Sequence, residues 1–248
     1  MNDAINLRDH IAPDGTLCLS DPAIADLSFL QAPEGLTELR HLTHLVLEYT
    51  MVSDISPLAN LENLTHLVIS GENFTDISPI GELSQLTHLE LKYNPITDLS
   101  PLGRLKKLTS VSLVHNRLTD ISSLAPLTGL IELQLHHNKI ADVSPLSHLG
   151  ALKHLALGNN RIDDISALGK LENLTDLGLS KNRISDISPL GQLRQLYRLY
   201  LGSNRIGDYS PLRALTHLRF LHLHRDEIND ESKASLLDAL PDLTIYCE

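Results

Sequence analysis

The sequence predicts an α/β solenoid, with a curved parallel sheet on the concave face and 3₁₀ or irregular segments on the convex face. Three observations support this class: a 22-residue period, an alternation of leucines typical of a half-buried strand, and an asparagine after each central strand. The clearest repeat reads LTDLGLSKNRISDISPL, from Leu174 to Leu190. Because one repeat cannot bury its apolar side alone, neighbouring repeats must stack, with strands about 4.8 Å apart.

The first half of each repeat is the strand and the turn that ends it. Leu174, Leu177 and Leu179 are expected to point into the coil, and Asn182 can bond to backbone groups that the turn leaves unpaired. A buried carboxylate is costly, so we expect an irregular turn at Glu72, with Asn73 taking over its role. The asparagine column runs Thr50, Glu72, Asn94, Asn116, Asn138, Asn160, Asn182, Asn204 and Asp226.

The second half of each repeat is the returning segment. Asp186 can cap a turn, and Ser188-Pro189 looks like an N-cap followed by proline at the first helical position. Too few residues remain in the period for a long helix, which favours a 3₁₀ or irregular segment. The aspartate column runs Asp54, Asp76, Asp98, Asp120, Asp142, Asp164, Asp186, Asp208 and Asp230.

The period covers nearly the whole chain, so we predict one domain, 1–248, with an N-terminal cap (1–16), repeats (17–226) and a C-terminal cap (227–248). The first two strand leucines, Leu17 and Leu45, are further apart than one period, which places six extra residues near 31–35. The stretch 229–240 has a capping-type start and spaced apolar positions, so it is predicted to be a true helix. Leu243 and Ile245 are then expected to return in phase, one period beyond Leu221 and Leu223.

The pattern LxxLxLxxNxI resembles the leucine-rich repeat. The 22-residue spacing and the DISPL turn are similar to internalins and to the leucine-rich regulatory subunit of protein phosphatase 1. The first resemblance implies a bacterial surface adhesin that binds a host receptor. The second implies a cytoplasmic partner that is itself an enzyme, and the repeats support both equally because they specify the fold and not the ligand.

Composition limits the partner and the compartment. The net charge of −11 disfavours nucleic acid and anionic membranes, although the nine aspartates of the column supply most of the acidity. The sequence has no apolar run of membrane-spanning length, and Met1–Ala12 does not resemble a signal peptide. Cys18 and Cys247 lie in the first and last strand regions, which suits a reducing compartment. We therefore expect a cytoplasmic monomer with no membrane contact.

The concave face is where a partner is expected to bind. Its C-terminal third gathers tyrosine and arginine, which are enriched in binding hot spots, beside a floor of small residues. We predict a non-enzymatic scaffold for a protein or peptide partner, with the binding residues Tyr197, Arg198, Tyr200, Phe220, His222, His224 and Arg225. The floor consists of Ala156, Gly158, Gly178, Ser180 and Gly202.

Histidines suggest a different class, a metal- or small-molecule-binding protein. His44, His66 and His88 should stack on adjacent strands, close enough to share a metal in principle. However, LTHL recurs as a repeat consensus and no cysteine or carboxylate pair completes a shell, so we predict no metal and no cofactor. A pH-sensitive interface is the stronger alternative. No nucleophile–base pair or phosphate loop is present, which argues against an enzyme.

A basic column follows the asparagines. Its members are expected to pair with the nearby aspartate column across the loop edge, each pair contributing about 0–1 kcal/mol to stability. An acidic partner docking along this edge is the alternative. The column consists of Arg117, Lys139, Arg161, Arg183 and Arg205.

Overall fold

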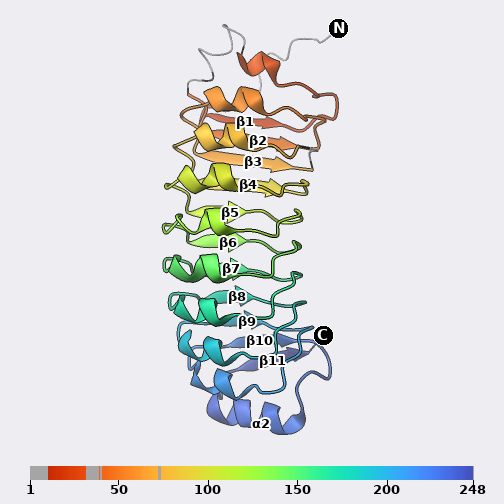
Figure 1. Cartoon of the computed structure of the whole chain (residues 1–248), viewed down its shortest axis with the longest axis vertical. Helices are drawn as coiled ribbons and strands as arrows, with labels where there is room; N and C mark the ends of the chain where they lie inside the picture. Colours follow the sequence, from red (N-terminus) through yellow and green to blue (C-terminus); the bar gives the residue numbers. More distant parts are fainter. Residues whose placement is uncertain (1–10, 32–38, 40, 72–73, 248) are drawn as a thin grey trace. The chain divides into compact units, whose positions relative to one another are not determined.

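The computed structural model describes residues 11–31, 39, 41–71 and 74–247. The chain divides into two compact units, Met1–Arg117 and Leu118–Glu248. The prediction of one domain over residues 1–248 stays a prediction. Both units are built from the predicted coils, in which a short parallel strand alternates with a 3₁₀ segment (Figure 1).

The described residues of the first unit form five parallel strands in sequence order. From the second strand onward each pairing advances by one period, as in His44 with His66, whereas the pairing of Thr16 with His44 spans six extra residues. The predicted insertion is therefore confirmed, although most of its predicted position lies outside the described residues. The strands are β1 (Thr16–Leu19), β2 (His44–Glu48), β3 (His66–Ser70), β4 (His88–Lys92) and β5 (Ser110–Ser112), and the 3₁₀ segments are η2 (Ser28–Gln31), η3 (Ser56–Asn60), η4 (Ser78–Glu82) and η5 (Ser100–Arg104).

The described residues of the second unit continue the pattern with six parallel strands, and a true helix, α2 (Asp230–Ala239), precedes the last of them. The predicted C-terminal helix is thus confirmed, and Asn229 caps it by accepting a hydrogen bond from the Ser232 amide at 2.7 Å. The strands are β6 (Glu132–Gln134), β7 (His154–Ala156), β8 (Asp176–Gly178), β9 (Arg198–Tyr200), β10 (Phe220–Leu223) and β11 (Thr244–Cys247), and the 3₁₀ segments are η6 (Ser122–Leu124), η7 (Ser144–His148), η8 (Ser166–Lys170), η9 (Ser188–Gln192) and η10 (Ser210–Ala214).

The predicted register of the last strand is wrong by two residues. Leu221 pairs with Ile245, and Leu223 with Cys247, so the last coil is longer than the period by that amount. The helical turns of α2 occupy more chain than a 3₁₀ segment does, and Leu243 lies in the turn before β11, where its amide bonds to the Leu240 carbonyl at 3.0 Å. Because side chains alternate with a period of two, this shift keeps the same strand face toward the core.

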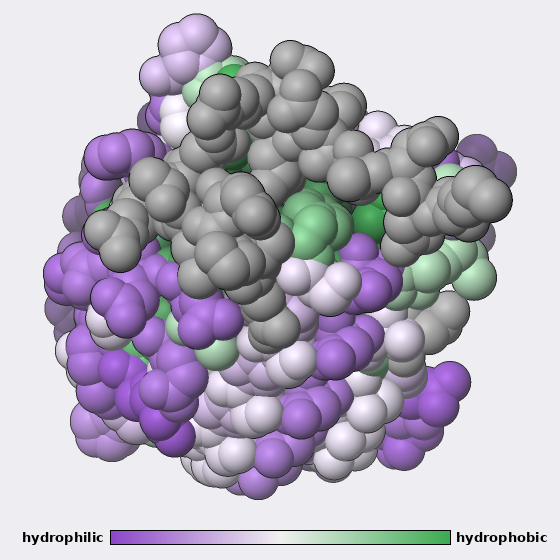
Figure 2. Space-filling model, turned by 90° about the horizontal axis from the view of Figure 1, so that it is seen from above, coloured by the Kyte–Doolittle hydropathy of each residue, from purple (hydrophilic) through white to green (hydrophobic). Residues whose placement is uncertain are grey.

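The leucines of the repeat form the core, as predicted. Leu174, Leu177 and Leu179 are fully buried, and so is Ile184. Figure 2 shows hydrophilic residues over most of the described surface in the view from above, and hydrophobic residues near its centre and at its right edge. Burial of leucine, which removes apolar surface from water, is therefore the main source of stability in each coil.

The asparagines connect neighbouring coils. Asn182 donates to the Leu157 carbonyl of the preceding coil at 3.0 Å and to its own coil's Leu179 carbonyl at 2.9 Å. Its side-chain oxygen accepts from the Ile162 amide at 3.1 Å. In the described part of the chain, the one buried side-chain nitrogen or oxygen without a partner is Oδ1 of Asn94. The coil before it contains Glu72 and Asn73, where the irregular turn was predicted, and both lie outside the described residues.

The last member of the asparagine column is a wrong prediction. Asp226 has a positive φ of 67°, the conformation that the preceding coils adopt one position before the asparagine, as at Ser203. The column is displaced by one residue there, and Glu227 takes over the polar role. Its two carboxylate oxygens accept from the Ser203 amide at 2.6 Å and from the His224 amide at 2.7 Å.

At the start of the 3₁₀ segments, the predicted aspartate cap is present but the predicted serine N-cap is not. Asp186 accepts from the Ser188 amide at 2.8 Å, which confirms its capping role, and seven other aspartates of the column do the same. Ser188 is not the N-cap, because Ile187 holds that position without a side-chain bond and Ser188 is the first residue of η9. The exception in the column is Asp230, which begins α2.

Candidate partner-binding face

Alternate strand residues point out of the coil and form what we call the strand face of each unit. In the second unit this face changes abruptly from small residues to rings. Gly178 of β8 pairs in register with Tyr200 of β9, which is followed by His222 of β10 and Tyr246 of β11. Because paired residues on parallel strands lie side by side, the three rings form a column.

The rings of β9, β10 and β11 are in direct contact with one another. Tyr200 stacks on His222 with ring centroids 4.4 Å apart, and His222 stacks on Tyr246 at 4.6 Å. Beside this column, Tyr197 contacts Phe220 edge to face at 5.4 Å. We call Tyr197, Arg198, Tyr200, Phe220, His222 and Tyr246 the aromatic cluster.

Arg198 joins the aromatic cluster to a polar group on the neighbouring strands. Its guanidinium lies 5.4 Å from the Tyr197 ring centre and 5.8 Å from that of Phe220, within the range of a cation–π contact. It also forms an ion pair with Asp176 at 3.0 Å, and the second oxygen of Asp176 lies 3.1 Å from the His154 ring. Asp176 therefore holds the guanidinium beside the two rings.

Five of the seven residues predicted to bind a partner lie in the aromatic cluster. The other two, His224 and Arg225, follow β10 in the turn, where the His224 amide bonds to Glu227 and its ring lies 3.3 Å from the Arg225 carbonyl. They are outside the cluster because β10 ends at Leu223. Tyr246 was missed because the two-residue register error placed it beside His224 instead of His222. The sequence signal that could have identified it is a tyrosine in the last predicted strand, at a position that alternates with the core residues.

The floor of small residues is partly required by the fold. A Cβ atom at Gly202 would lie 2.8 Å from the His224 backbone nitrogen, and one at Gly158 would lie 3.3 Å from the Ser180 carbonyl oxygen. At Gly178 the nearest atom would be 3.7 Å away, an ordinary contact. The close approach of the neighbouring coil therefore explains why position 202 is a glycine. Position 178 has room for a Cβ atom, so packing does not require a glycine there.

The predicted histidine stack is present in the first unit. The rings of His44 and His66 are 4.0 Å apart, and those of His66 and His88 are 4.2 Å apart. Burial, followed by the neighbouring His88 and His44, holds the pKa of His66 below its usual value of 6.5. Within the described residues, no group of three or more His, Cys, Asp or Glu side chains is arranged to hold a metal.

A threonine hydroxyl sets the orientation of each stacked ring. The Thr65 hydroxyl donates to the Thr43 carbonyl at 3.0 Å, and its oxygen lies 2.8 Å from Nδ1 of His66. Since the one hydroxyl proton is used, the ring must donate from Nδ1, as does His88 to Thr87. The rings are thus tied to the coil through threonine.

The predicted pairing between the basic and aspartate columns is wrong. In the described part of the chain no ion pair joins them, and the aspartates bond instead to serine amides. These hydrogen bonds lower the pKa of Asp164, Asp186 and Asp208. A backbone amide two residues away is reached without ordering a long side chain, which an exposed ion pair would require.

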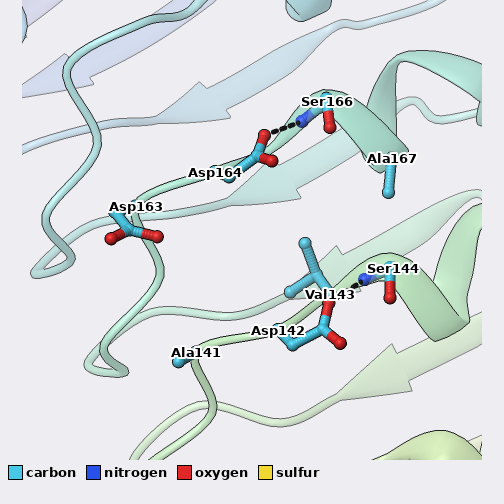
Figure 3. A pocket seen from close by; sticks show the side chains of 8 residues that line it. All are labelled: Ala141, Asp142, Val143, Ser144, Asp163, Asp164, Ser166 and Ala167. Carbon is cyan, nitrogen blue, oxygen red and sulfur yellow. Dashed lines mark hydrogen bonds between the residues drawn. The ribbon is translucent and has the colours of Figure 1, made fainter.

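A notch of about 280 Å³ lies at the loop edge next to η7 and η8 (Figure 3). Asp142, Asp163 and Asp164 contribute its acidic lining. Figure 3 shows the carboxylates of Asp142 and Asp164 turned toward the amides of Ser144 and Ser166, which they bind at 2.8 Å. These two aspartates therefore serve the fold.

Among the described residues, no helix has the length and apolar character needed to cross a bilayer.

Comparisons with known proteins point to one repeat family. A family model described as leucine-rich repeats in two copies matches residues 84–126, 128–170 and 172–214. No curated protein matches the chain significantly.

Solved structures give closer likenesses. An internalin (inlF) of Listeria monocytogenes is 35% identical with a TM-score of 0.82, over 93% of this chain and 66% of that chain. Internalin C2 (inlC2) of the same species is 36% identical with a TM-score of 0.74, over 76% and 83%. The ectodomain of the plant receptor kinase GASSHO1/SCHENGEN3 from Arabidopsis thaliana, in complex with CASPARIAN STRIP INTEGRITY FACTOR 2, is 26% identical with a TM-score of 0.68, over 77% and 25%. The chain thus spans just under two thirds of the first relative and a quarter of the third.

Proposed function

Because the chain belongs to the leucine-rich repeat family, we propose that it is a non-enzymatic scaffold that binds a protein or peptide partner through the aromatic cluster. Proteins of this family commonly bind protein partners, and the plant ectodomain was solved in complex with CASPARIAN STRIP INTEGRITY FACTOR 2. Fold alone does not identify a ligand, so the proposal rests on the residues of the strand face.

The exposure of the aromatic cluster is the observation that carries the proposal. Tyr197, Tyr200 and Tyr246 are 42%, 38% and 40% exposed, whereas Leu199 and Leu221 beneath them are fully buried. The rings therefore add little to the core. Contiguous exposed rings beside an arginine are typical of a surface that a partner covers, since tyrosine and arginine dominate binding hot spots.

The proposal is tested by comparing what wild type and Tyr200→Ala/Phe220→Ala capture from cells of the source organism, by quantitative mass spectrometry. We expect a protein that wild type enriches and that the double variant retains at least about tenfold less, because hot-spot truncations are costly to affinity. Direct titration of that purified protein then repeats the comparison. Thermal melting should be nearly unchanged.

The matched control is Tyr49→Ala/Tyr93→Ala, which removes two tyrosines of the first unit that are 76% and 59% exposed. This variant should capture the same protein as wild type. If the Tyr200→Ala/Phe220→Ala variant binds the purified partner as tightly as wild type does, the aromatic cluster is not the binding site.

We further propose the cytoplasm as the location, since the described cysteines, Cys18 and Cys247, are both free and exposed thiols. The likeness to internalins supports the alternative of a bacterial surface adhesin. Digestion of intact cells with a protease distinguishes the two, because a surface protein is degraded and a cytoplasmic one is protected.

A further inference from the structure

The second unit carries a row of cations that the fold does not use. We call Lys139, Arg161, Arg183 and Arg205 the basic row, and all four side chains are exposed. Each is anchored through its backbone amide, which donates to a carbonyl of the preceding coil. The acceptors are the carbonyls of Leu118, Ile140, Ile162 and Ile184, at distances of 2.8 to 2.9 Å.

The basic row has no acidic partner among the described residues. The adjacent aspartates are engaged elsewhere, with Asp164, Asp186 and Asp208 each bound to a serine amide at 2.8 Å. Their charge offsets the row through solvent, where attraction is weak, and not through contact. The cationic groups are therefore open to a ligand.

The spacing of the basic row makes its charge unfavourable for the isolated protein. Its members occupy successive coils, so they repeat at about the 4.8 Å spacing of neighbouring strands. Like charges that lie close together in the turns of successive coils repel one another, and a neutral polar residue with the same backbone bond would avoid this cost. A row that the fold neither neutralises nor needs is suited to neutralisation by a partner.

We propose that the basic row binds an extended acidic segment of a partner protein, made of consecutive aspartate and glutamate residues. Guanidinium groups bind carboxylates with two parallel hydrogen bonds, and the repeat presents such groups in a line. A peptide segment fits better than nucleic acid, because the net charge of −11 repels a long polyanion that extends past the row. This surface is separate from the aromatic cluster, and its test leaves that cluster intact.

The test is fluorescence anisotropy of a labelled deca-glutamate peptide with the whole chain and with Arg161→Gln/Arg183→Gln/Arg205→Gln. We expect saturable binding by wild type, at least about tenfold weaker binding by the triple variant, and weakening as salt is added. The corresponding triple Arg→Lys variant should keep most of the affinity because it keeps the charge. Circular dichroism melting checks that the variants fold.

A variant with the same change in net charge serves as the control. Lys170→Gln/Arg194→Gln/Arg213→Gln removes three exposed cations, of which Lys170 and Arg213 lie in 3₁₀ segments and Arg194 lies in the turn after η9. This variant should bind the peptide within about twofold of wild type. The proposal is overturned if wild type does not bind deca-glutamate. It is also overturned if the Arg161→Gln/Arg183→Gln/Arg205→Gln variant and the control variant lose affinity equally. Tighter binding of a ten-nucleotide oligothymidylate than of the peptide would overturn it in favour of nucleic acid.

Discussion

Among the described residues, two sets of stacked rings lie on the strand faces, one in each unit, and they are held in different ways. His44, His66 and His88 stack in the first unit, and each ring is bonded at 2.8 Å to a threonine hydroxyl. In the second unit, Tyr200 and Tyr246 stack on His222. No hydrogen bond in the described structure ties those three side chains to the coil.

The difference separates framework from surface. A ring that donates to a threonine, which itself donates to the preceding coil, is part of the network that connects the repeats. A ring held only by neighbouring rings can be covered or displaced by a partner without disturbing that network. This difference supports the proposal that the histidine stack belongs to the scaffold and that the aromatic cluster is free to contact a partner.

The largest expected effect concerns the floor beside the aromatic cluster, where Gly202 and Gly178 look alike in sequence. Gly202→Ala should lower the free energy of unfolding by about 1–3 kcal/mol, because its Cβ would press on the His224 backbone. Gly178→Ala should change it by no more than about 0.5 kcal/mol. Urea unfolding of both variants measures this difference. Equal stability would show that the fold does not require glycine at position 202 any more than at position 178.

The sequence was sufficient for the repeat and insufficient for its end. The fixed period determines which leucines meet and where each asparagine bonds, so the coils follow from spacing alone. At the last coil a helix replaces the 3₁₀ segment, and the length of chain it occupies cannot be counted from the period. This is why the register of β11, the role of Glu227 and the place of Tyr246 were missed.

Five of the residues predicted to bind a partner could be placed side by side from the sequence, because they occupy strand positions that the repeat leaves unconstrained. Gly202 also occupies such a position but is less free than its place in the repeat indicates, since the backbone clearance between coils leaves no sign in the sequence of one repeat. The predicted pairing of the basic and aspartate columns was wrong for another reason. The sequence does not show that a serine amide lies within hydrogen-bond distance of each carboxylate.

A smaller effect tests the hydrogen bonds that distinguish the two sets of rings. Thr65→Val keeps the shape of the side chain but removes the bonds to the His66 ring and the Thr43 carbonyl, so the protein should lose about 0.5–2 kcal/mol of stability. Tyr200→Phe removes a hydroxyl that has no such role and should cost under about 0.5 kcal/mol. Thermal unfolding of both variants measures the two losses. Equal losses of stability would contradict the conclusion that only the histidine stack is hydrogen-bonded to the coils.

The smallest effect is a dependence of stability on pH that originates in the histidine stack. The pKa of His66 lies below 6.5 in the folded protein, because of burial first and then of its two histidine neighbours. Below pH 6.5 the unfolded chain therefore binds more protons at this site than the folded chain does. The stabilisation is fully present above pH 6.5 and is lost as the pH falls through that value toward the folded pKa.

His66→Gln should reduce this loss of stability between pH 7.5 and pH 5.5, measured by urea unfolding at both values. NMR titration of the wild-type imidazole signals should show His66 with a midpoint below 6.5. A midpoint at or above 6.5 would mean that the stack does not disfavour the protonated ring. The histidines could then charge with little cost to the fold, and a pH-dependent role would have to be sought in binding instead of in stability.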